Sequence, residues 1–206
     1  MKKRKPYFAK ASKGNKKYSI VAIDESGRGP LAGPISVAAI AATDDSQLKL
    51  LKNIRDSKKL SEKQREEWFA VLKNNFEYRV SMVGSRIIDR VGIKRATQVA
   101  VNRVLCRLLH GKLPDVVLLD GLLKAPKRYS QQTIIKGDEK VPLISAASIM
   151  AKVKRDRKMR RVHESFPEYF FDRHKGYGTK LHYAMIKKHG RLSCHRDSFL
   201  KNVAQK

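Results

Sequence analysis

The sequence predicts an α/β fold: a mixed central β-sheet flanked by helices, followed by a C-terminal helical segment. Short apolar runs typical of buried strands are interspersed with longer segments of helical pattern. The first two apolar runs are joined by a short link rich in glycine and proline, which favours an antiparallel pair. Further along, helical and strand-like segments alternate, which is the order expected of helices packed on a sheet.

Strands are expected where apolar residues run continuously or alternate with polar ones. These segments are residues 18 to 25, 35 to 42, 76 to 83, 115 to 121 and 132 to 136. The segment 115 to 121 is continuously apolar and is bounded by Pro114 and Gly121. Such a run is typical of a strand that is buried on both faces.

Helices are expected in four segments, which are residues 61 to 74, 85 to 110, 145 to 163 and 180 to 189. Ser61 is the predicted N-cap of the first helix, and Trp68 on the same helix is expected in the core. The second helix is expected to be interrupted near Gly92 and to end at Gly111.

The charge balance of the chain predicts a polyanionic partner. Lysine and arginine number 46 against 19 acids, which gives a net charge of +27. No apolar run approaches the roughly 18 residues that span a bilayer, and no signal peptide is recognisable, so no membrane partner is expected and nucleic acid is favoured. Cys106 and Cys194 are expected as reduced thiols of a cytoplasmic protein, which we expect to be a monomer.

The chain divides into three parts by composition and pattern. Residues 1 to 17 carry eight lysines and arginines and no acid, and form the expected basic N-terminal tail. Contact with phosphates and a purely solubilising role are both open for this tail. Residues 18 to 165 are the expected catalytic core, and residues 166 to 206 are the expected C-terminal loop and helical segment.

Acidic residues stand where the buried strands end. Asp24 and Glu25 end the first strand, Asp120 ends a later one, and Asp138 lies in "KGDEKVP" before a predicted helix. A buried carboxylate is costly unless a cation compensates it, and that cation could be arginine, lysine or a metal ion. Because adjacent strand side chains point to opposite faces, Asp24 and Glu25 can share a site only if the backbone turns at once. The open alternative is that these acids are turn formers or salt-bridge partners.

Clustered carboxylates in a basic chain favour a particular chemistry. Hard oxygen ligands suit Mg²⁺ or Mn²⁺, and a pair of such ions is typical of phosphodiester hydrolysis. The stretch "GRGPLAG" lacks the spacing of the dinucleotide-binding fingerprint and the lysine of a phosphate-binding loop. Glycines let a backbone approach a ligand closely, so this stretch could contact a sugar and its 2′-hydroxyl.

The motifs together resemble those of bacterial ribonuclease HII, the type 2 ribonucleases H. The resemblance covers residues 18 to 200, and it rests on collinear motifs: "AIDESGRGPLAGP", "DSKKLS", "LLDG", "KGD", "SAASIMAKVKRD", "HKGYGTKLH" and "HRDSF". It implies a ribonuclease H-like fold and Mg²⁺- or Mn²⁺-dependent cleavage of RNA in RNA–DNA hybrids. It also implies incision on the 5′ side of ribonucleotides embedded in duplex DNA, leaving a 3′-hydroxyl and a 5′-phosphate.

The resemblance also assigns residues. It implies that the metal-site acids are Asp24, Glu25, Asp120 and Asp138. It implies that Gly27, Arg28 and Gly29 read the ribose at the RNA–DNA junction. It further implies that Tyr177 packs on the adjacent deoxynucleotide and that Lys58 and Ser145 contact phosphates. Asp197 in "HRDSF" departs from the expected pattern and puts a phosphate contact there in doubt, and Asp156 is interpreted as a structural partner of nearby basic residues.

A crowded basic segment follows the serine-rich motif. Between residues 152 and 161 it carries Lys152, Lys154, Arg155, Arg157, Lys158, Arg160 and Arg161. Given the total charge we expect these side chains to contact phosphates rather than form an ordinary solvated face. Two other functions fit the charge: a non-catalytic basic RNA-binding protein, and a nuclease of the same fold that cuts plain DNA.

Overall fold

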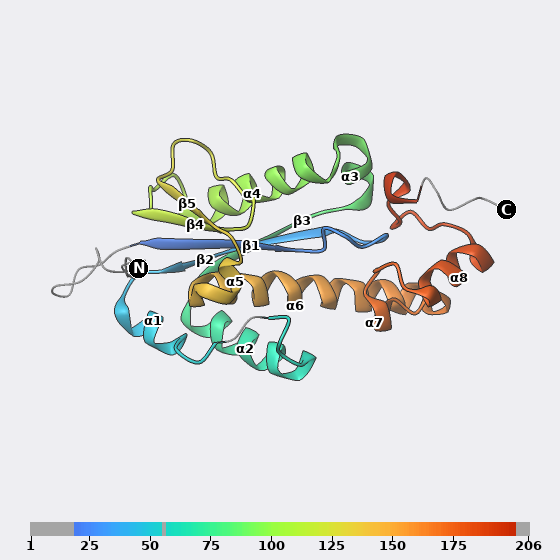
Figure 1. The fold of residues 1–206 in the computed structure, drawn as a ribbon, viewed down its shortest axis with the longest axis horizontal. Coiled ribbons are helices and arrows are strands. Elements are labelled where there is room, and N and C mark those ends of the chain that lie inside the picture. The colour runs from blue at the N-terminus through green and yellow to red at the C-terminus, as the bar shows by residue number, and fades with distance from the viewer. Residues whose placement is uncertain (1–18, 55–56, 201–206) are drawn as a thin grey trace, which may run out of the picture.

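A mixed five-stranded sheet lies at the centre of the part of the chain that the computed structural model describes, residues 19–54 and 57–200 (Figure 1). The strands are β1 (Ile20–Ser26), β2 (Ile35–Ala42), β3 (Glu77–Val83), β4 (Val116–Asp120) and β5 (Gln131–Ile134), in the order β3-β2-β1-β4-β5. β1 is antiparallel to β2 and parallel to β4, which confirms the predicted mixed sheet. The predicted basic tail, residues 1 to 17, lies outside the described residues.

The helices lie close to their predicted positions. They are α1 (Asp45–Leu50), α2 (Glu62–Asn75), α3 (Ser85–Val91), α4 (Ile93–Leu109), α5 (Gly137–Lys140), α6 (Pro142–Ser165), α7 (Phe171–His174) and α8 (Lys180–His189), with short 3₁₀ turns at Pro167–Tyr169 and Asp197–Phe199. Ser61 caps α2 through a reciprocal capping box with Gln64, as the sequence predicts. The break between α3 and α4 falls at Gly92, whose φ of 79° most side chains would not tolerate.

Three local predictions differ from the structure. The short helices α1, α5 and α7 are not predicted, because helices of six and four residues carry little periodic signal. β5 ends at Ile134 rather than residue 136. Helix α6 begins three residues before its predicted start, at Pro142, where the fixed φ of proline suits the first helical turn.

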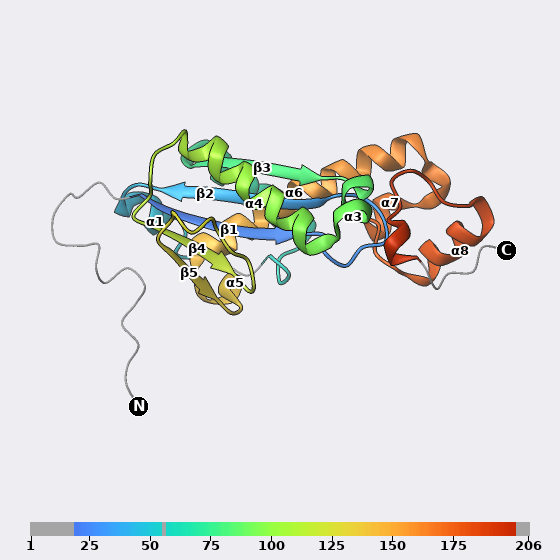
Figure 2. The ribbon, with the colours of Figure 1, turned by 90° about the horizontal axis from the view of Figure 1, so that it is seen from above.

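Helices cover both faces of the sheet and leave a separate helical end. In Figure 1, α3 and α4 lie on one side of the sheet, and α6, α2 and α1 lie on the other. Alternation along β1 serves both layers: Val21 and Ile23 belong to the core under α4, whereas Ile20 and Ala22 belong to the core under α6. Figure 2 shows α6 running past the end of the sheet, where α7 packs beside it and α8 contacts the 3₁₀ turn at Pro167–Tyr169.

The C-terminal segment is joined by backbone hydrogen bonds to the loop between β1 and β2. The amides of Leu31 and Ala32 donate to the Gly176 carbonyl at 2.8 and 3.2 Å, and the Arg196 amide donates to the Leu31 carbonyl at 2.7 Å. This places residues 176 to 196 against the glycine-rich stretch that follows the first two acids. The predicted division of the chain at residue 165 stays a prediction.

The basic segment of α6 differs from its prediction. Arg155 is fully buried and donates to the carbonyls of the β1–β2 loop, so the expectation that it contacts a phosphate is wrong. Arg157 and Arg160 pair with Glu66 and Glu62 of α2 and join the two helices. These arginines have partners because α2 packs alongside α6, which the sequence pattern of α6 alone does not reveal.

Two further expectations concern single residues. Asp156 pairs with Lys152 one helical turn away, with 2.7 Å between Nζ and Oδ2, which confirms a structural role. Trp68 is half-buried and packs against the edge of the core under α6, where its neighbour Phe69 is the buried ring, so the expectation of a core tryptophan is only partly met.

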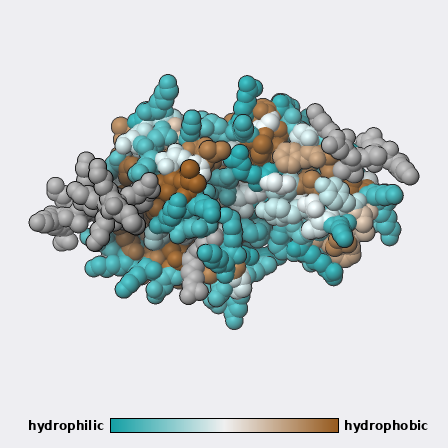
Figure 3. All heavy atoms as spheres, in the orientation of Figure 1, coloured by the Kyte–Doolittle hydropathy of each residue, from teal (hydrophilic) through white to brown (hydrophobic). Residues whose placement is uncertain are grey.

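Figure 3 shows hydrophilic side chains over most of the visible face, with small hydrophobic areas between them.

Candidate active site

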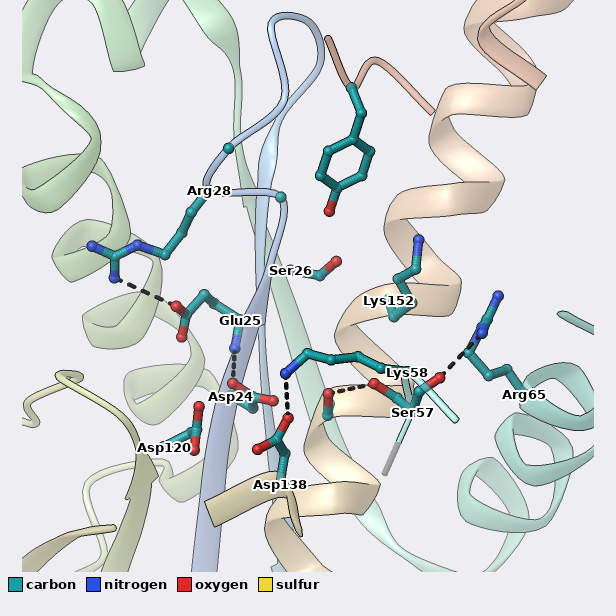
Figure 4. Close-up of a pocket in the computed structure, with 14 residues that line it drawn as sticks. Asp24, Glu25, Ser26, Arg28, Ser57, Lys58, Arg65, Asp120, Asp138 and Lys152 are labelled. Carbon is teal, nitrogen blue, oxygen red and sulfur yellow. Dashed lines mark hydrogen bonds and ion pairs between the residues drawn. The ribbon is translucent and has the colours of Figure 1, made fainter. Parts of the chain in front are cut away.

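A pocket of about 420 Å³ lies beyond the end of β4, between β1, α5 and α6 (Figure 4). The predicted site residues that line it are Asp24, Glu25, Asp120, Asp138, Gly27, Arg28, Gly29, Lys58 and Tyr177. Of the predicted site residues only Ser145 is outside this lining. Four acids from three separate segments of the chain therefore meet at one opening in the surface.

The way in which Asp24 and Glu25 share the pocket differs from the sequence expectation. The backbone does not turn after Asp24, since β1 stays paired with β2 as far as Ser26. The pairing of β1 with β4 ends earlier, at Ile23 and Leu119. Beyond that point one edge of β1 is uncovered, so side chains on its two faces both reach the same opening. The expected immediate turn after Asp24 is therefore absent. Asp24 and Glu25 share the pocket because the pairing of β4 with β1 ends before β1 does.

Asp24 is a buried carboxylate among other carboxylates. Its side chain is 4% exposed, and its Oδ1 accepts a hydrogen bond from the Glu25 amide at 2.7 Å. Burial raises the pKa of Asp24 well above its ordinary value, and the charges of Glu25 and Asp120 raise it further. A hydrogen bond with the Ser148 side chain on α6 opposes part of this rise.

Glu25 and Asp120 are also carboxylates whose charged forms are disfavoured by burial. Burial raises the pKa of Glu25, while Arg28, whose Nη1 lies 3.4 Å from Oε1, opposes the rise. The other carboxylate oxygen of Glu25, Oε2, is buried without a hydrogen-bond partner. Burial also raises the pKa of Asp120, although the Gly137 amide donates to its Oδ1 at 2.6 Å and opposes the rise.

Asp138 completes the set from the short helix α5. Its side chain is buried, and its Oδ2 lies 2.7 Å from the ammonium nitrogen of Lys58. The Ser145 hydroxyl donates to the backbone carbonyl of Asp138, so the serine stabilises the connection between α5 and α6. Ser145 is itself buried and hydrogen-bonded, and this geometry gives no support to direct contact with a phosphate.

The donor set suits a hard divalent cation. Within residues 19–54 and 57–200, no three metal-binding side chains lie close enough together to form a ready-made chelate. Three observations nevertheless indicate a cation-binding pocket: four carboxylates line it, the pKa values of three of these acids are raised, and Glu25 Oε2 is unpartnered. Basic side chains already supply positive charge to this cluster: Lys58 pairs with Asp138, Arg28 pairs with Glu25, and Arg65 and Lys152 also line the pocket.

The glycine-rich turn is held from behind by two buried arginines. Arg196 donates to the carbonyls of Gly27, Arg28 and Gly33 at 2.7, 2.9 and 2.9 Å. Arg155 donates to the Pro34 carbonyl at 3.0 Å. Gly27 has a φ of 95°, and a Cβ there would lie 2.1 Å from Arg155 Nε, so this position requires glycine.

Gly29 and Tyr177 present the open side of the pocket. A Cβ added at Gly29 would meet nothing within 4 Å, and the residue is exposed, so a ligand can approach this backbone closely. Tyr177 is 41% exposed, and its ring has Arg155 Cζ at 5.5 Å and Lys152 Nζ at 6.0 Å from its centroid. Both residues therefore contribute surfaces that solvent or a ligand can reach.

Several polar residues of the pocket were not predicted as site residues. They are Ser26, Ser57, Arg65 and Ser148, and the hydroxyls of Ser57 and Ser148 lie 2.8 Å apart. Lys152, which was expected only as one of the phosphate contacts of the basic segment, lines the pocket as well. A signal existed for Ser148 and Lys152. Ser145, Ser148, Lys152 and Asp156 recur at helical spacing and so fall on one face of α6. That spacing would have identified Ser148 and Lys152, one and two turns after Ser145.

Comparison with known proteins gives a consistent result. A family model described as Ribonuclease HII matches residues 21–202. The Ribonuclease HII of Caldicellulosiruptor bescii is 43% identical over 185 residues, covering 89% of this chain and 87% of the relative. The Ribonuclease HII of Coxiella burnetii is 43% identical over 181 residues, covering 87% of each.

Solved structures share the fold. Ribonuclease HII from Archaeoglobus fulgidus, solved in a complex with PCNA, gives a TM-score of 0.75 at 28% identity, covering 91% of this chain and 97% of that one. Ribonuclease H2 from Pyrococcus horikoshii gives 0.70 at 25% identity, covering 90% and 96%. Bst-RNase HIII, solved with Mn²⁺, gives 0.70 at 17% identity, covering 93% and 72%, and shows likeness of fold alone.

Proposed function

Because this chain belongs to the ribonuclease HII family, it is an endoribonuclease that acts on RNA–DNA hybrids, and we propose that the four-carboxylate pocket is its active site. The single observation that carries this proposal is that Asp24, Glu25, Asp120 and Asp138 line one opening beside the glycine-rich turn. We further propose that the enzyme incises duplex DNA on the 5′ side of an embedded ribonucleotide. The products are a 3′-hydroxyl and a 5′-phosphate.

We propose that the four carboxylates hold Mg²⁺ or Mn²⁺. Their hard oxygen donors fit such ions, and the unpartnered oxygen of Glu25 supports this. When bound, two such ions activate water and stabilise the leaving oxygen of a phosphodiester. The chain's own part is to hold the acids apart and ionised: Arg28 faces Glu25, Gly137 donates to Asp120, and Lys58 faces Asp138.

The neighbouring surfaces suit recognition of the ribonucleotide. The backbone of Gly29 is open to a close approach, so we propose that the turn at Gly27, Arg28 and Gly29 contacts the ribose and its 2′-hydroxyl. Tyr177 then packs on the adjacent deoxynucleotide, and Lys58 contacts a phosphate. In this scheme the 2′-hydroxyl is a recognition group and not the nucleophile. Attack by the 2′-hydroxyl itself would produce a cyclic phosphate.

The direct test is a DNA duplex that carries one ribonucleotide, incubated with Mg²⁺ or Mn²⁺ beside an all-DNA duplex and a long RNA–DNA hybrid. We expect incision 5′ of the ribonucleotide and no cleavage of all-DNA. Cleavage of the all-DNA duplex would favour the alternative of a DNA nuclease. Binding without cleavage of either ribonucleotide-containing substrate, by folded protein and with both ions, would favour the alternative of a non-catalytic RNA-binding protein.

Tyr177 offers a test of ribonucleotide recognition. We expect Tyr177→Ala to reduce kcat/KM at a single embedded ribonucleotide about tenfold more than on a long hybrid, since stacking contributes roughly 1–3 kcal/mol per base. Tyr177→Phe is the matched control because it keeps the ring and should keep most of the activity. An equal loss on both substrates would contradict the proposed role of the ring.

Two further properties complete the proposal. Within the described residues, no helix is long and apolar enough to cross a membrane. Cys106 and Cys194 are both free thiols, which supports a cytoplasmic enzyme. We propose a monomer, which sedimentation of the purified protein tests directly.

A further inference from the structure

Three histidines are buried together beneath the loop that carries Tyr177, and none of them lines the active-site pocket. His174, His182 and His195 are 8, 0 and 2% exposed. The rings of His174 and His182 stack with centroids 4.3 Å apart, and those of His182 and His195 lie 5.2 Å apart. A buried cluster of polar rings is costly unless each ring nitrogen has a partner of the right kind.

The partners of His182 and His195 determine where their protons lie. His182 Nδ1 lies 3.0 Å from the Tyr177 carbonyl, which can only accept, so Nδ1 carries the proton. Neutral His182 therefore accepts at Nε2, which lies 3.0 Å from His195 Nε2, so His195 donates from Nε2. His195 Nδ1 is then an acceptor, and the Leu192 amide donates to it at 2.8 Å.

His174 has a defined tautomer by the same reasoning. The Gly176 amide donates to its Nδ1 at 3.1 Å, so Nε2 carries the proton and donates to the Tyr169 carbonyl at 2.8 Å. The cluster thus holds the backbone on both sides of the Tyr177 side chain, at the Gly176 amide and at the Tyr177 carbonyl. Leu192, His195, His182 and Tyr177 form one directional chain of hydrogen bonds from the C-terminal segment to the loop.

We propose that His182 and His195 are positioning residues for Tyr177, acting as a neutral, directionally hydrogen-bonded pair. This inference rests on the proposed role of Tyr177 in recognising a single ribonucleotide. The pair fixes the position and orientation of the loop backbone from which the Tyr177 ring projects. In the same loop the Gly176 carbonyl accepts hydrogen bonds from the amides of Leu31 and Ala32, so the pair also fixes the position of Tyr177 relative to the glycine-rich turn.

The arrangement requires that both rings stay neutral. A second proton on His182 would sit on Nε2 and face the Nε2–H of His195. A second proton on His195 would sit on Nδ1, which accepts from the Leu192 amide at 2.8 Å and lies 3.3 Å from the Leu192 carbonyl, so it would displace the amide hydrogen bond. Burial lowers the pKa of His182 to about 4, with the neighbouring His174 and His195 adding to the effect. Burial also lowers the pKa of His195; a backbone hydrogen bond with Leu192 and the charge of Asp197 oppose the shift, and Arg191 and His174 add to it.

His174 completes the set of titratable neighbours. Burial lowers its pKa as well, while Asp172 opposes that shift and Lys175 adds to it. All three rings are therefore neutral at the pH of an ordinary activity assay. The rings of Tyr169 and Phe171 close the cluster from the other side and bring no charge to it.

The kinetic test compares kcat/KM on a duplex with one ribonucleotide with kcat/KM on a long hybrid. His182→Leu removes the donor to the Tyr177 carbonyl and should lower this ratio about tenfold, because small misplacements of positioning groups have large effects on rate. His182→Asn keeps a donor near Nδ1 and should recover most of the ratio. His195→Gln, which keeps a donor near Nε2, should likewise exceed His195→Leu.

Two controls separate positioning from general loss of structure. His110→Asn changes an exposed histidine in a left-handed conformation that asparagine tolerates, and should leave the ratio unchanged. In a Tyr177→Ala background, His182→Leu should have no further effect on the ratio. An unchanged ratio in His182→Leu, or an equal further fall in the Tyr177→Ala background, would overturn the proposal.

A spectroscopic test is independent of activity. Long-range ¹H–¹⁵N correlation of the histidine rings at pH 7 should show the Nδ1–H form for His182 and the Nε2–H form for His195 and His174. The opposite tautomer at His182, or a protonated His182 at pH 6, would overturn the proposed pair. If the wild-type protein cuts neither substrate while these tautomers are observed, the proposed function fails and the positioning role fails with it, but the hydrogen-bond chain stands.

Discussion

Replacing Asp24 with asparagine should stabilise the protein while it removes catalysis. Asp24 is buried, and burial together with the charges of Glu25 and Asp120 raises its pKa. Asparagine is nearly the same size and keeps an oxygen that accepts from the Glu25 amide. The substitution thus removes a buried like charge and retains the hydrogen bond, a trade of activity for stability that is common at active sites.

The size of the effect follows from these contacts. Without divalent ions at pH 7, we expect Asp24→Asn to raise the free energy of unfolding by about 1–2 kcal/mol, the range typical of relieving one strained active-site group. For a chain of 206 residues this corresponds to a rise in Tm of about 2–6 °C. Differential scanning calorimetry in EDTA measures it. Added Mg²⁺ or Mn²⁺ should stabilise the wild type and narrow the difference, because the ions bind the folded carboxylates.

The pH dependence provides a check of sign. The folded pKa of Asp24 lies above its unfolded value of about 3.9, so between the two values the folded protein binds more protons. The wild type therefore loses stability as pH rises through this window, and Asp24→Asn lacks that loss. The advantage of the variant should be absent near pH 4 and should grow as the pH rises from there to 7. A lower Tm at pH 7, or an advantage that persists at pH 4, would refute the reasoning.

Three further predictions test other parts of the site. Gly27→Ala should destabilise the protein by about 2–4 kcal/mol and abolish activity, since its Cβ would overlap Arg155 and its φ is positive. Gly29→Ala should keep the Tm within roughly 1 °C and still reduce kcat/KM, because a Cβ there meets nothing within 4 Å. Equal Tm values for the two variants would contradict this contrast. Ser61→Ala should lower stability by about 1 kcal/mol through loss of the α2 capping box, and a fall in kcat would mean that Ser61 has a second role. Lys58→Ala should reduce the slope of log K against log salt by about 0.9 for duplex binding in EDTA, and an unchanged slope would exclude its phosphate contact.

Much of the fold could be predicted because its signals are local. The apolar runs of β1 and β2, the cap at Ser61 and the break at Gly92 each depend on a few neighbouring residues, and each lies where the sequence indicates. Asp24, Glu25 and Asp120 were predicted for a similar reason, because they lie at the ends of two separate apolar runs, whereas Asp138 was assigned through the resemblance of its motif. Asp24, Glu25 and Asp120 meet because the parallel strands β1 and β4 end at the same side of the sheet, and α5 adds Asp138 to the same pocket.

Long-range packing accounts for what the sequence pattern did not reveal. Arg155 occurs in a basic run typical of a phosphate-binding face, yet it is fully buried because the loop after β1 folds over α6 and offers its carbonyls. Ser148 rather than Ser145 lines the pocket because Ser145, one turn earlier on the same face of α6, donates to the backbone carbonyl of Asp138. The histidine pair joins residues 13 positions apart through side chains alone, and no local pattern signals such a contact.

The sequence by itself determined which segments become the strands and the longer helices and which acids stand at strand ends, since hydrophobic periodicity and capping act over a few residues. Only the tertiary structure decided how Asp24 and Glu25 come to share one pocket, because that depends on β4 ending while β1 continues beside β2. It also decided which basic side chains face inward. The physical reason is that a buried charge takes whichever partner the packed elements bring to it, and the chain's own order does not specify that partner.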